Sequence, residues 1–379
     1  MRFISLLLAL SAALLPMTAP AWADSDAPAS KKRQLQPHKG KERDVRKAAS
    51  RKKRELREMG VRNVRVKTPG DWPRKVSVPK ETTLQELPVE DGRSGVMYES
   101  NNYRYYSPGK LTHDAQKTLS RLCECAQAAN RAIGSVLPVP RATAERGDKK
   151  FVVILQPSRQ DYLAAGGPRN SAGVFMGRLR AGKNPPREED IMMDCVMIPY
   201  ESLGLNRAGA VQNADIDTHA LVHELTHQQF LLNNLPIWAN EGWAEYVGYV
   251  PYVGEDLDFE RGFSLILHTA IKRASVDALD FDFKLEDFLT MDQQTMYGYM
   301  EQRKDTYTLA AMAVAFFVHL DGKRGVEAMK AYLQAILDGK SAEEARDVLI
   351  EPYYSAARLQ QTFTRAWRGK KVKVSFPKK

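Results

Sequence analysis

Two histidines four residues apart constrain this chain more than any other feature. His223 and His227 belong to the segment His-Glu-Leu-Thr-His. On an α-helix, side chains at i and i+4 lie on the same face with Cβ atoms about 6 Å apart, so two imidazoles can bind one ion. Leu221, Leu225 and Leu232 fall on the opposite face, about 160–200° from His223. The pattern predicts a helix with one face in an apolar core and one face presenting histidines.

Capping signals set the limits of this helix and indicate another directly after it. Asp215 is expected to be its N-cap and Asn233-Asn234 its stop. Pro236 suits the first turn of the next helix, because proline is tolerated where the backbone N–H has no helical partner. A pair of antiparallel helices is therefore predicted.

The second helix carries two carboxylates that share a face. Glu241 and Glu245 are four residues apart, and the turn between the helices can direct them toward the two histidines. The alternative is a carboxylate pair on the surface. Burial is favoured by three neighbouring aromatic residues, Trp238, Trp243 and Tyr246. A buried carboxylate requires a cation.

The N-terminus has the pattern of an export signal. Arg2 gives a positive start, residues 4–15 form an apolar run, and Ala21-Trp22-Ala23 is a small-x-small cleavage site. The alternative is a membrane anchor, but Pro16 and Pro20 end the run short of the roughly 20 apolar residues that a span needs. We expect cleavage after Ala23 and a secreted or periplasmic protein.

The positive charge of the chain is concentrated in an arm behind this signal. Residues 31–67 contain 16 Lys or Arg and four Asp or Glu, a net charge of +12, whereas the whole chain has +10. The arm lacks the apolar residues of a core. It is expected either to bind an anionic envelope polymer or to be a solvated spacer. No base-reading fold is indicated, so specific nucleic-acid recognition is not expected.

The remaining patterns predict a small mixed sheet followed by a mostly helical half, an α+β fold. Residues 1–23 are assigned to the signal peptide, 24–94 to the arm and a Pro-rich linker, and 95–379 to one domain. The expected elements are a strand at 98–106, a helix at 111–133, a strand at 151–155, a short helix capped by Ser158 and stopped by Gly166-Gly167, a strand at 191–198, and a helix opened by a capping box at 341–344.

Three cysteines in an exported chain suggest one disulfide and one thiol. They are Cys123, Cys125 and Cys195. Cys123 and Cys125 point about 200° apart on a helix, so they cannot share a partner. A Cys-x-Cys metal clip is the alternative, and the pairing stays open.

The two-helix motif resembles that of a known peptidase clan. H-E-L-T-H followed by P-x-W-x-N-E-G-x-A-E-Y is similar to the gluzincin zinc peptidases, which include thermolysin and the membrane alanyl aminopeptidases. The chain looks most like the bacterial peptidase-MA-like proteins. The clear match covers residues 221–246, and a looser one residues 98–367. The resemblance implies a zincin-like fold around the H-E-x-x-H helix.

The resemblance also implies a role for each residue of the motif. It implies one zinc ion per chain on His223, His227 and Glu241, with Glu224 as general base and Glu245 supporting the first histidine. Asn240, beside Glu241 in the N-E-G segment, is expected to belong to the layer behind the ligands. Only 13 residues separate His227 from Glu241, fewer than in thermolysin and the aminopeptidases, so the turn must be tighter.

The other histidines are not expected to bind the ion. His219 and His227 lie eight residues apart, about 12 Å along a helix, too far for one ion with bonds near 2 Å. His219 is therefore expected behind the ligands or in the pocket wall. His268 and His319 lie in apolar helical stretches and are expected to pack. A metzincin would need Gly at 230 and His at 233, where this chain has Phe230 and Asn233.

Tyr307, further along the chain, is the candidate hydrogen-bond donor to the oxyanion. Tyr307 opens Tyr-Thr-Leu-Ala-Ala-Met, which resembles the aminopeptidase Tyr-x-x-Gly segment that carries a catalytic tyrosine. The alternative is a packing tyrosine. The amine anchor Gly-x-Met-Glu-Asn of the aminopeptidases is absent, which favours endopeptidase or amidase action.

The sequence therefore predicts an exported zinc hydrolase of peptide or amide bonds, with Glu224 and Tyr307 as catalytic residues. The rival interpretation is an inactive envelope-binding or scaffolding protein with a structural metal site. The intact Glu224 argues against that rival, since binding alone needs no base.

Overall fold

A computed structural model describes most of the chain beyond residue 71. The described residues are 72–78, 84–87, 95–144, 149–169, 171–182, 184–212, 219–253 and 256–377. All described residues belong to one compact unit. The predicted signal peptide, the basic arm and the N-cap Asp215 lie outside the described residues.

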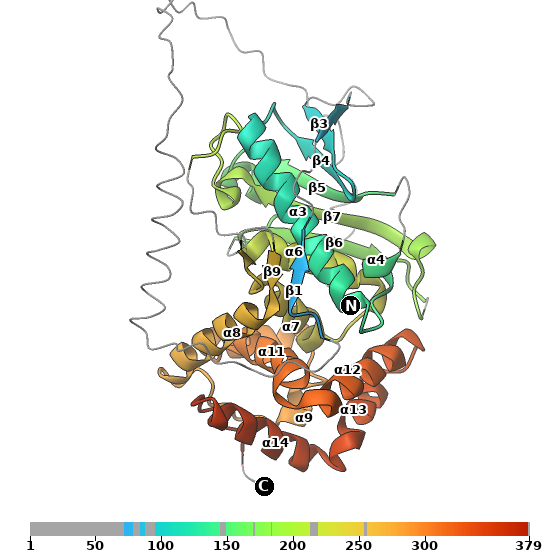
Figure 1. Cartoon of the computed structure of the whole chain (residues 1–379), viewed down its shortest axis with the longest axis vertical. Helices are drawn as coiled ribbons and strands as arrows, with labels where there is room; N and C mark the ends of the chain where they lie inside the picture. Colours follow the sequence, from blue (N-terminus) through green and yellow to red (C-terminus); the bar gives the residue numbers. More distant parts are fainter. Residues whose placement is uncertain are drawn as a thin grey trace, which may run out of the picture. The chain divides into compact units, whose positions relative to one another are not determined.

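The main sheet has six strands in the order β2-β3-β4-β5-β7-β6 (Figure 1). Their bounds are Gln85–Leu87 for β2, Val96–Glu99 for β3, Tyr103–Ser107 for β4, Phe151–Gln156 for β5, Ile191–Pro199 for β7 and Val174–Leu179 for β6. The central pairs β4–β5 and β5–β7 are parallel, whereas β2–β3, β3–β4 and β6–β7 are antiparallel. The sheet is thus mixed, as predicted, and β6 is an antiparallel edge strand.

The region expected to be a single strand at 98–106 is instead the hairpin β3–β4. Buried Glu124 explains the turn, because its carboxylate accepts hydrogen bonds from the Ser100 hydroxyl (2.8 Å) and from the Asn102 backbone N–H (2.9 Å). A buried carboxylate with several donors on one turn overrides the local strand pattern. The strands predicted at 151–155 and 191–198 and the Ser158 cap agree with the structure, but β6 is not predicted by the sequence.

Two pieces of the range expected to be linker are packed into this unit. β1 (Lys75–Ser77) pairs with β9 (Asp256–Asp258), and β2 pairs with β3. Trp72 is buried, and its indole N–H donates to the Tyr246 hydroxyl at 3.0 Å. These contacts are not predictable from the sequence, because the segment around Trp72 is Pro-rich and isolated three-residue strands leave almost no periodic signal.

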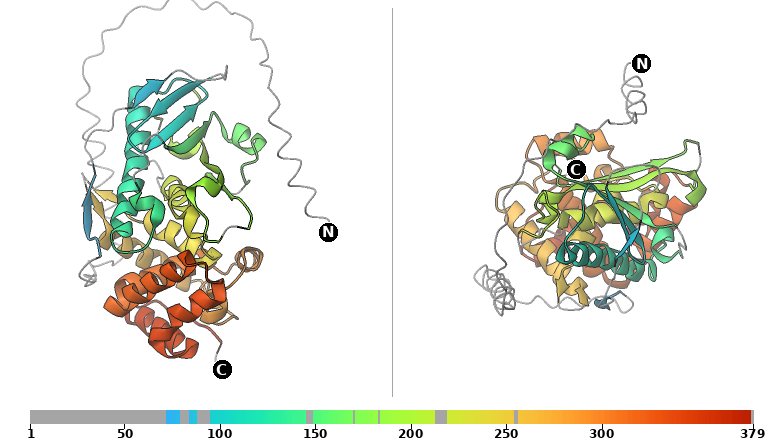
Figure 2. Two further views of the ribbon diagram at one scale, coloured as in Figure 1. Left: turned by 90° about the vertical axis from the view of Figure 1, so that its right-hand side faces the viewer. Right: turned by 90° about the horizontal axis from the view of Figure 1, so that it is seen from above.

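Two long helices cover one side of the main sheet. α3 (His113–Gly134) packs against β4, α6 (His219–Phe230) packs against β6 and β7, and the two helices contact each other. Figure 2 shows α3 running along the sheet. Leu221 and Leu225 are buried in the core between α6 and the sheet, as their position opposite His223 predicts.

The second half is helical and encloses its own core. The helices are α7 (Ile237–Gly248), α8 (Phe259–Ala274), α9 (Leu285–Phe288), α10 (Gln293–Glu301), α11 (Thr306–Ala315), the π-helical turn η4 (Phe316–Leu320), α12 (Gly322–Leu337), α13 (Ala342–Ile350) and α14 (Ala356–Gly369). A three-stranded sheet, β1-β9-β8 with β8 at Tyr252–Val253, lies beside them. The predicted capping box on Ser341 is present. The architecture is thus α+β.

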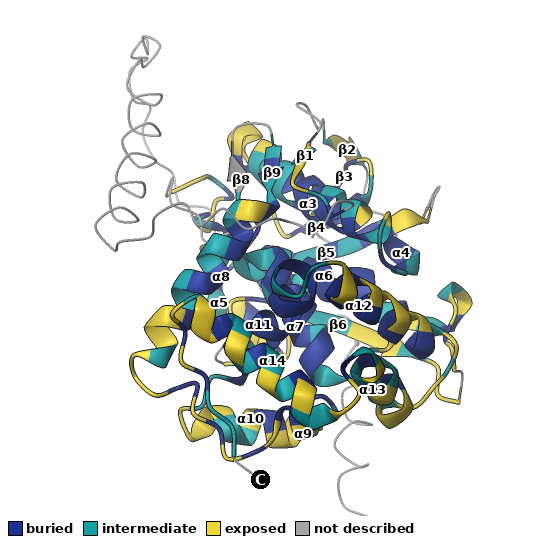
Figure 3. Cartoon of the chain, turned by 60° about the horizontal axis from the view of Figure 1, so that its bottom comes forward, coloured by how far each residue is buried: buried dark blue, intermediate teal, exposed yellow. Residues whose placement is uncertain are grey.

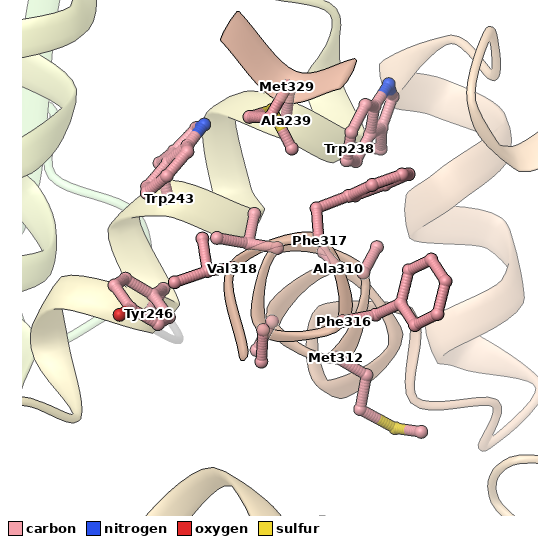
Figure 4. Close-up of a cluster of buried hydrophobic side chains, with 14 of the residues drawn as sticks. Trp238, Ala239, Trp243, Tyr246, Ala310, Met312, Phe316, Phe317, Val318 and Met329 are labelled. Carbon is pink, nitrogen blue, oxygen red and sulfur yellow. The ribbon is translucent and has the colours of Figure 1, made fainter. Parts of the chain in front are cut away.

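The crossing of α7 and α11 forms the centre of this helical core. Figure 4 shows Trp238, Trp243 and Tyr246 of α7 around the chain of α11 and η4. A Cβ atom at Gly242 would lie 2.8 Å from the Ala310 carbonyl oxygen, so only glycine allows this approach. Figure 3 shows buried residues concentrated on α6, α7 and α11, with exposed outer faces on α12 to α14. The close crossing brings the start of α11 next to the carboxylates of α7.

The three cysteines are free and buried, so the expected disulfide is not formed. Cys123 belongs to the core under the sheet and Cys125 to the core of the helical half. The two residues lie on opposite faces of α3, which separates them as their spacing predicts. Cys195 lies on β7. Burial raises the pKa of Cys125 to about 12, which suits packed thiols rather than reactive ones.

Candidate metal centre

Contacts that do not involve the histidines hold helix α6 in place, along its apolar face and at its C-terminal end. Its apolar face lies in the core under the sheet. At its C-terminal end, the buried Arg141 donates to the Gln228 carbonyl oxygen at 2.6 Å, and the Gln228 side chain donates to the Val152 carbonyl oxygen at 3.2 Å. A cation on the last carbonyl groups of a helix stabilises that end. The position of His227, one residue earlier, is therefore fixed by the scaffold.

Three ligand atoms meet at one point between α6 and α7. His223 Nε2 lies 3.0 Å from His227 Nε2 and 3.3 Å from Glu241 Oε2, and His227 Nε2 lies 3.5 Å from the same oxygen. Zinc bonds of about 2.0–2.1 Å at tetrahedral angles separate ligand atoms by about 3.3 Å. The three predicted ligands thus already have the spacing of one tetrahedral ion, and the cluster could hold a metal ion.

A second carboxylate stands behind the first histidine. Glu245 Oε1 lies 3.2 Å from His223 Nδ1, and Glu245 Oε2 lies 3.3 Å from His219 Nε2. A histidine that donates from Nδ1 presents the lone pair of Nε2, which is the form a metal requires. The supporting role predicted for Glu245 therefore has the right geometry, and His219 lies behind the ligands as expected.

The donor set fits a cation better than it fits any other partner. Glu241 Oε2 is buried, and the groups that face it at 3.3 and 3.5 Å among the described residues are two imidazole nitrogens. The exposed fractions of His223, His227 and Glu241 are 9%, 8% and 5%. Three lone-pair atoms this close repel one another in a buried site unless a positive charge lies between them.

The pKa values of the metal-free cluster show the same demand for positive charge. Burial lowers the pKa of His223, but hydrogen bonds to Glu241 and Glu245 outweigh it and raise this pKa to about 10. For Glu241, burial raises the pKa, while the charge of His227 and the hydrogen bonds of both ligand histidines lower it to about 2. A proton on His223 thus supplies the positive charge that the two carboxylates require.

Glu224 extends from the same helix toward the edge of the sheet. It is half-buried, and its Oε2 accepts a hydrogen bond of 2.6 Å from the backbone N–H of Phe175 on β6. The Phe175 ring stacks near His227, with 6.4 Å between ring centroids. The sequence did not identify Phe175, since its contribution is a backbone N–H and the only signal for β6 is a short apolar run at 174–176. The edge strand thus borders the metal centre.

Tyr307 is brought to the cluster by the first turn of α11. Its ring lies 6.3 Å from the His223 ring at an interplanar angle of 29°. Burial raises the pKa of Tyr307 well above its usual value, and the charge of Glu241 raises it further, so the hydroxyl remains protonated and able to donate. Tyr297 of α10 lies parallel to Tyr307 with 6.4 Å between ring centroids, and no sequence pattern indicates this neighbour.

The remaining predicted residues divide between support and packing. Asn240 precedes Glu241 on α7 and is half-buried, and its role stays a prediction. His268 is half-buried on α8. His319 is buried on η4 and pairs with the Tyr246 hydroxyl at 2.9 Å, while burial lowers its pKa to about 3. His319 is therefore a neutral packing histidine, as predicted.

Among the described residues, one group of His, Cys, Asp or Glu side chains is close enough together to hold a metal ion, and it contains no cysteine, so a cysteine-centred clip is not supported there. No helix of the described residues has both the length and the apolar character to cross a membrane. Comparisons with protein-family models, with curated proteins and with solved structures found no match. The candidate site therefore depends on its own geometry, a buried set of His223, His227 and Glu241 suited to a metal ion.

Proposed function

We propose that this chain is an exported zinc-dependent hydrolase of peptide or amide bonds, with a zincin-like arrangement of its α+β fold. The observation that carries the proposal is the spacing of the three ligand atoms, 3.0–3.5 Å, with Glu224 on the same helix. Zinc prefers such a nitrogen and oxygen set, and three protein ligands leave a fourth position open.

Zinc bound to these atoms would polarise the scissile carbonyl and acidify a water molecule. Glu224 then accepts a proton from that water and returns it to the leaving nitrogen, so the residue ends the cycle as a carboxylate. The Phe175 N–H holds Oε2 of Glu224, which leaves Oε1 for the water. The Tyr307 hydroxyl donates to the oxygen that gains negative charge.

The support behind the ligands serves orientation. One carboxylate oxygen of Glu245 orients the His223 ring, and the other oxygen contacts His219. Such partners commonly change metal affinity or activity by about 10–100-fold when removed. We also propose that residues 1–23 direct export and that the arm at 31–67 binds an anionic envelope polymer.

The rival function, a structural metal site without catalysis, is favoured by the enclosure of the cluster. All three ligands are buried, and Glu224 is occupied by a backbone N–H. A structural ion needs no access from solvent and no base. The two functions therefore differ in what Glu224 does.

Replacing Glu224 by Gln tests the proposal directly. Gln keeps the size of the side chain but cannot accept the proton, so hydrolysis should fall by about 10²–10⁴-fold, the usual contribution of a general base. Cleavage of a mixed peptide library is measured for the wild type and for Glu224→Gln, each with zinc and with a chelator. Zinc content should be equal in both proteins. Chelator-sensitive cleavage that persists unchanged in Glu224→Gln would remove Glu224 from the mechanism, and a zinc-loaded wild type without cleavage would favour the structural site.

A further inference from the structure

The last part of the chain carries only positive charge. From Pro352 to Lys379 there are eight Lys or Arg and no Asp or Glu. On α14 the apolar face is buried through Leu359, Phe363 and Trp367. Arg358, Arg365 and Arg368 are exposed on the outer side, within about 80° of one another around the helix. We call these three arginines the basic face of α14.

A hollow adjoins the end of this face. After α14 the chain turns at Lys371, whose φ is 65°, and the Val372 N–H donates to the Trp367 carbonyl oxygen at 3.0 Å. The hollow has a volume of about 200 Å³ and is lined by Thr364, Arg368, Lys371, Val372, Lys373 and Val374. Three cationic side chains and one hydroxyl thus surround a concave surface, which suits an anionic group.

The three cations of this hollow form no ion pair within the part of the chain that the structure describes. The exposed Arg273, in contrast, pairs with Asp305 at 2.6 Å. Arg368, Lys371 and Lys373 make no such ion pair with a described residue, and the nearby Asp280 is bonded to the Ser375 hydroxyl at 2.7 Å. Like charges held this close repel one another, and a bound anion removes that repulsion.

We propose that the hollow and the basic face of α14 together bind a linear polymer that carries phosphate groups. Arginine and lysine with a hydroxyl are the donors that recognise phosphate oxygens. The ten helical steps from Arg358 to Arg368 span about 15 Å, which exceeds one phosphate and matches a chain of them. This surface is separate from the metal centre and does not depend on its function.

A flat lipid surface fits these features less well. Membrane-bound helices insert several apolar side chains beside their cations. On the described part of the C-terminal segment, Tyr354 is the exposed large apolar side chain, with 85% of it accessible, and Arg358 lies over its ring at 5.5 Å. A concave site with a single aromatic ring favours a polymer whose anionic groups enter the hollow.

Lysine-reactivity footprinting of the full chain tests the proposal at single residues, so binding by the basic arm does not confuse the result. The protein is briefly acetylated with and without inorganic polyphosphate, and mass spectrometry reads each lysine. Lys371 and Lys373 should lose reactivity at least threefold, an order-of-magnitude expectation for direct contact, and the protection should vanish near 1 M salt, where the Debye length is about 3 Å. Lys117 on α3 and Lys330 on α12 are controls, because both are exposed. Figure 1 shows α3 in the upper and middle parts of the described unit and α14 at its bottom.

Two variants and one second ligand complete the experiment. Arg368→Glu should weaken the protection of Lys371 and Lys373, whereas Lys330→Glu should not. Absence of protection, or equal protection of the control lysines, would overturn the proposal. Protection by phosphatidylglycerol vesicles but not by polyphosphate would overturn it too, and would identify a membrane-binding surface.

Discussion

The candidate metal centre and the basic face of α14 both contain several charged side chains. They differ in the burial of these side chains and in the partners that the charged groups have. In the metal centre, the carboxylate and imidazole atoms are buried, and their partners lie within 3.5 Å. On α14 the cations are exposed, and Arg368 has no ion pair with a described residue. A buried charge requires specified partners, so its geometry indicates one chemistry. An exposed charge is satisfied by water, so its geometry indicates only a class of ligand.

The largest effects should come from breaking the buried set. Glu241→Ala removes a ligand and should abolish tight zinc binding, whereas Glu245→Ala removes a supporting carboxylate and should weaken metal affinity by about 10–100-fold. The two variants change the same residue type on the same helix, so each is the matched control of the other. Zinc affinity is measured by competition with a chelator. If Glu245→Ala empties the site while Glu241→Ala retains zinc, the ligand assignment is reversed.

A somewhat smaller effect is expected at Tyr307. If its hydroxyl meets the oxyanion, Tyr307→Phe should lower kcat by about 10²–10³-fold with little change in KM, since the interaction forms mainly in the transition state. The phenyl ring preserves the packing against His223, so zinc content should stay normal. Steady-state kinetics on a cleaved peptide provides the measurement. Turnover within a few-fold of the wild type in a zinc-loaded variant would make Tyr307 a packing residue, and Tyr297, which lies parallel to it, would become the candidate donor.

The smallest expected effect is the release of a proton when zinc binds. In the metal-free fold the pKa of His223 is raised to about 10, so this residue is protonated at pH 7. Zinc needs the neutral imidazole, and its binding at pH 7 should therefore release about one proton from His223. Calorimetric titration in two buffers of different ionisation enthalpy gives this number. Zinc binding without proton release would contradict the His223–Glu241 pairing.

The same pKa gives a sign for the stability of the metal-free protein. Because the pKa of His223 is raised above its usual value of about 6.5, the protonated pair stabilises the fold fully below about pH 6.5. This contribution is lost as the pH rises through about 10. Arginines on α14 remain charged throughout this range, so the exposed region should show no comparable change.

The parts of the site predictable from the sequence are those fixed by local helix geometry. The spacing of His223 and His227 places both on one face of α6 wherever that helix lies. Glu241 follows from the short turn to α7, since 13 intervening residues leave few arrangements for an antiparallel pair. Tyr307 required the family resemblance, because the approach of α11 to α7 depends on Gly242 and on core packing. The α+β class was likewise predictable from the order of strand and helix patterns.

The features that could not be predicted from the sequence depend on long-range contacts or on backbone groups. The Phe175 N–H that holds Glu224 has no side-chain signature. Trp72 stands in a segment of linker-like composition, yet its indole bonds to Tyr246, 174 residues away. The expected disulfide rested on counting cysteines, whereas the fold places Cys123 and Cys125 in different cores.

The most direct test of the central claim is the metal content of the purified protein. Elemental analysis of the wild type should find one zinc per chain, and His227→Ala should contain almost none while its circular dichroism remains that of a folded protein. Lys330→Glu, a change of an exposed residue on α12, serves as the control and should keep one zinc. A folded wild type that takes up no zinc, or stoichiometric zinc that survives in His227→Ala, would contradict the assignment of His223, His227 and Glu241 as a zinc site.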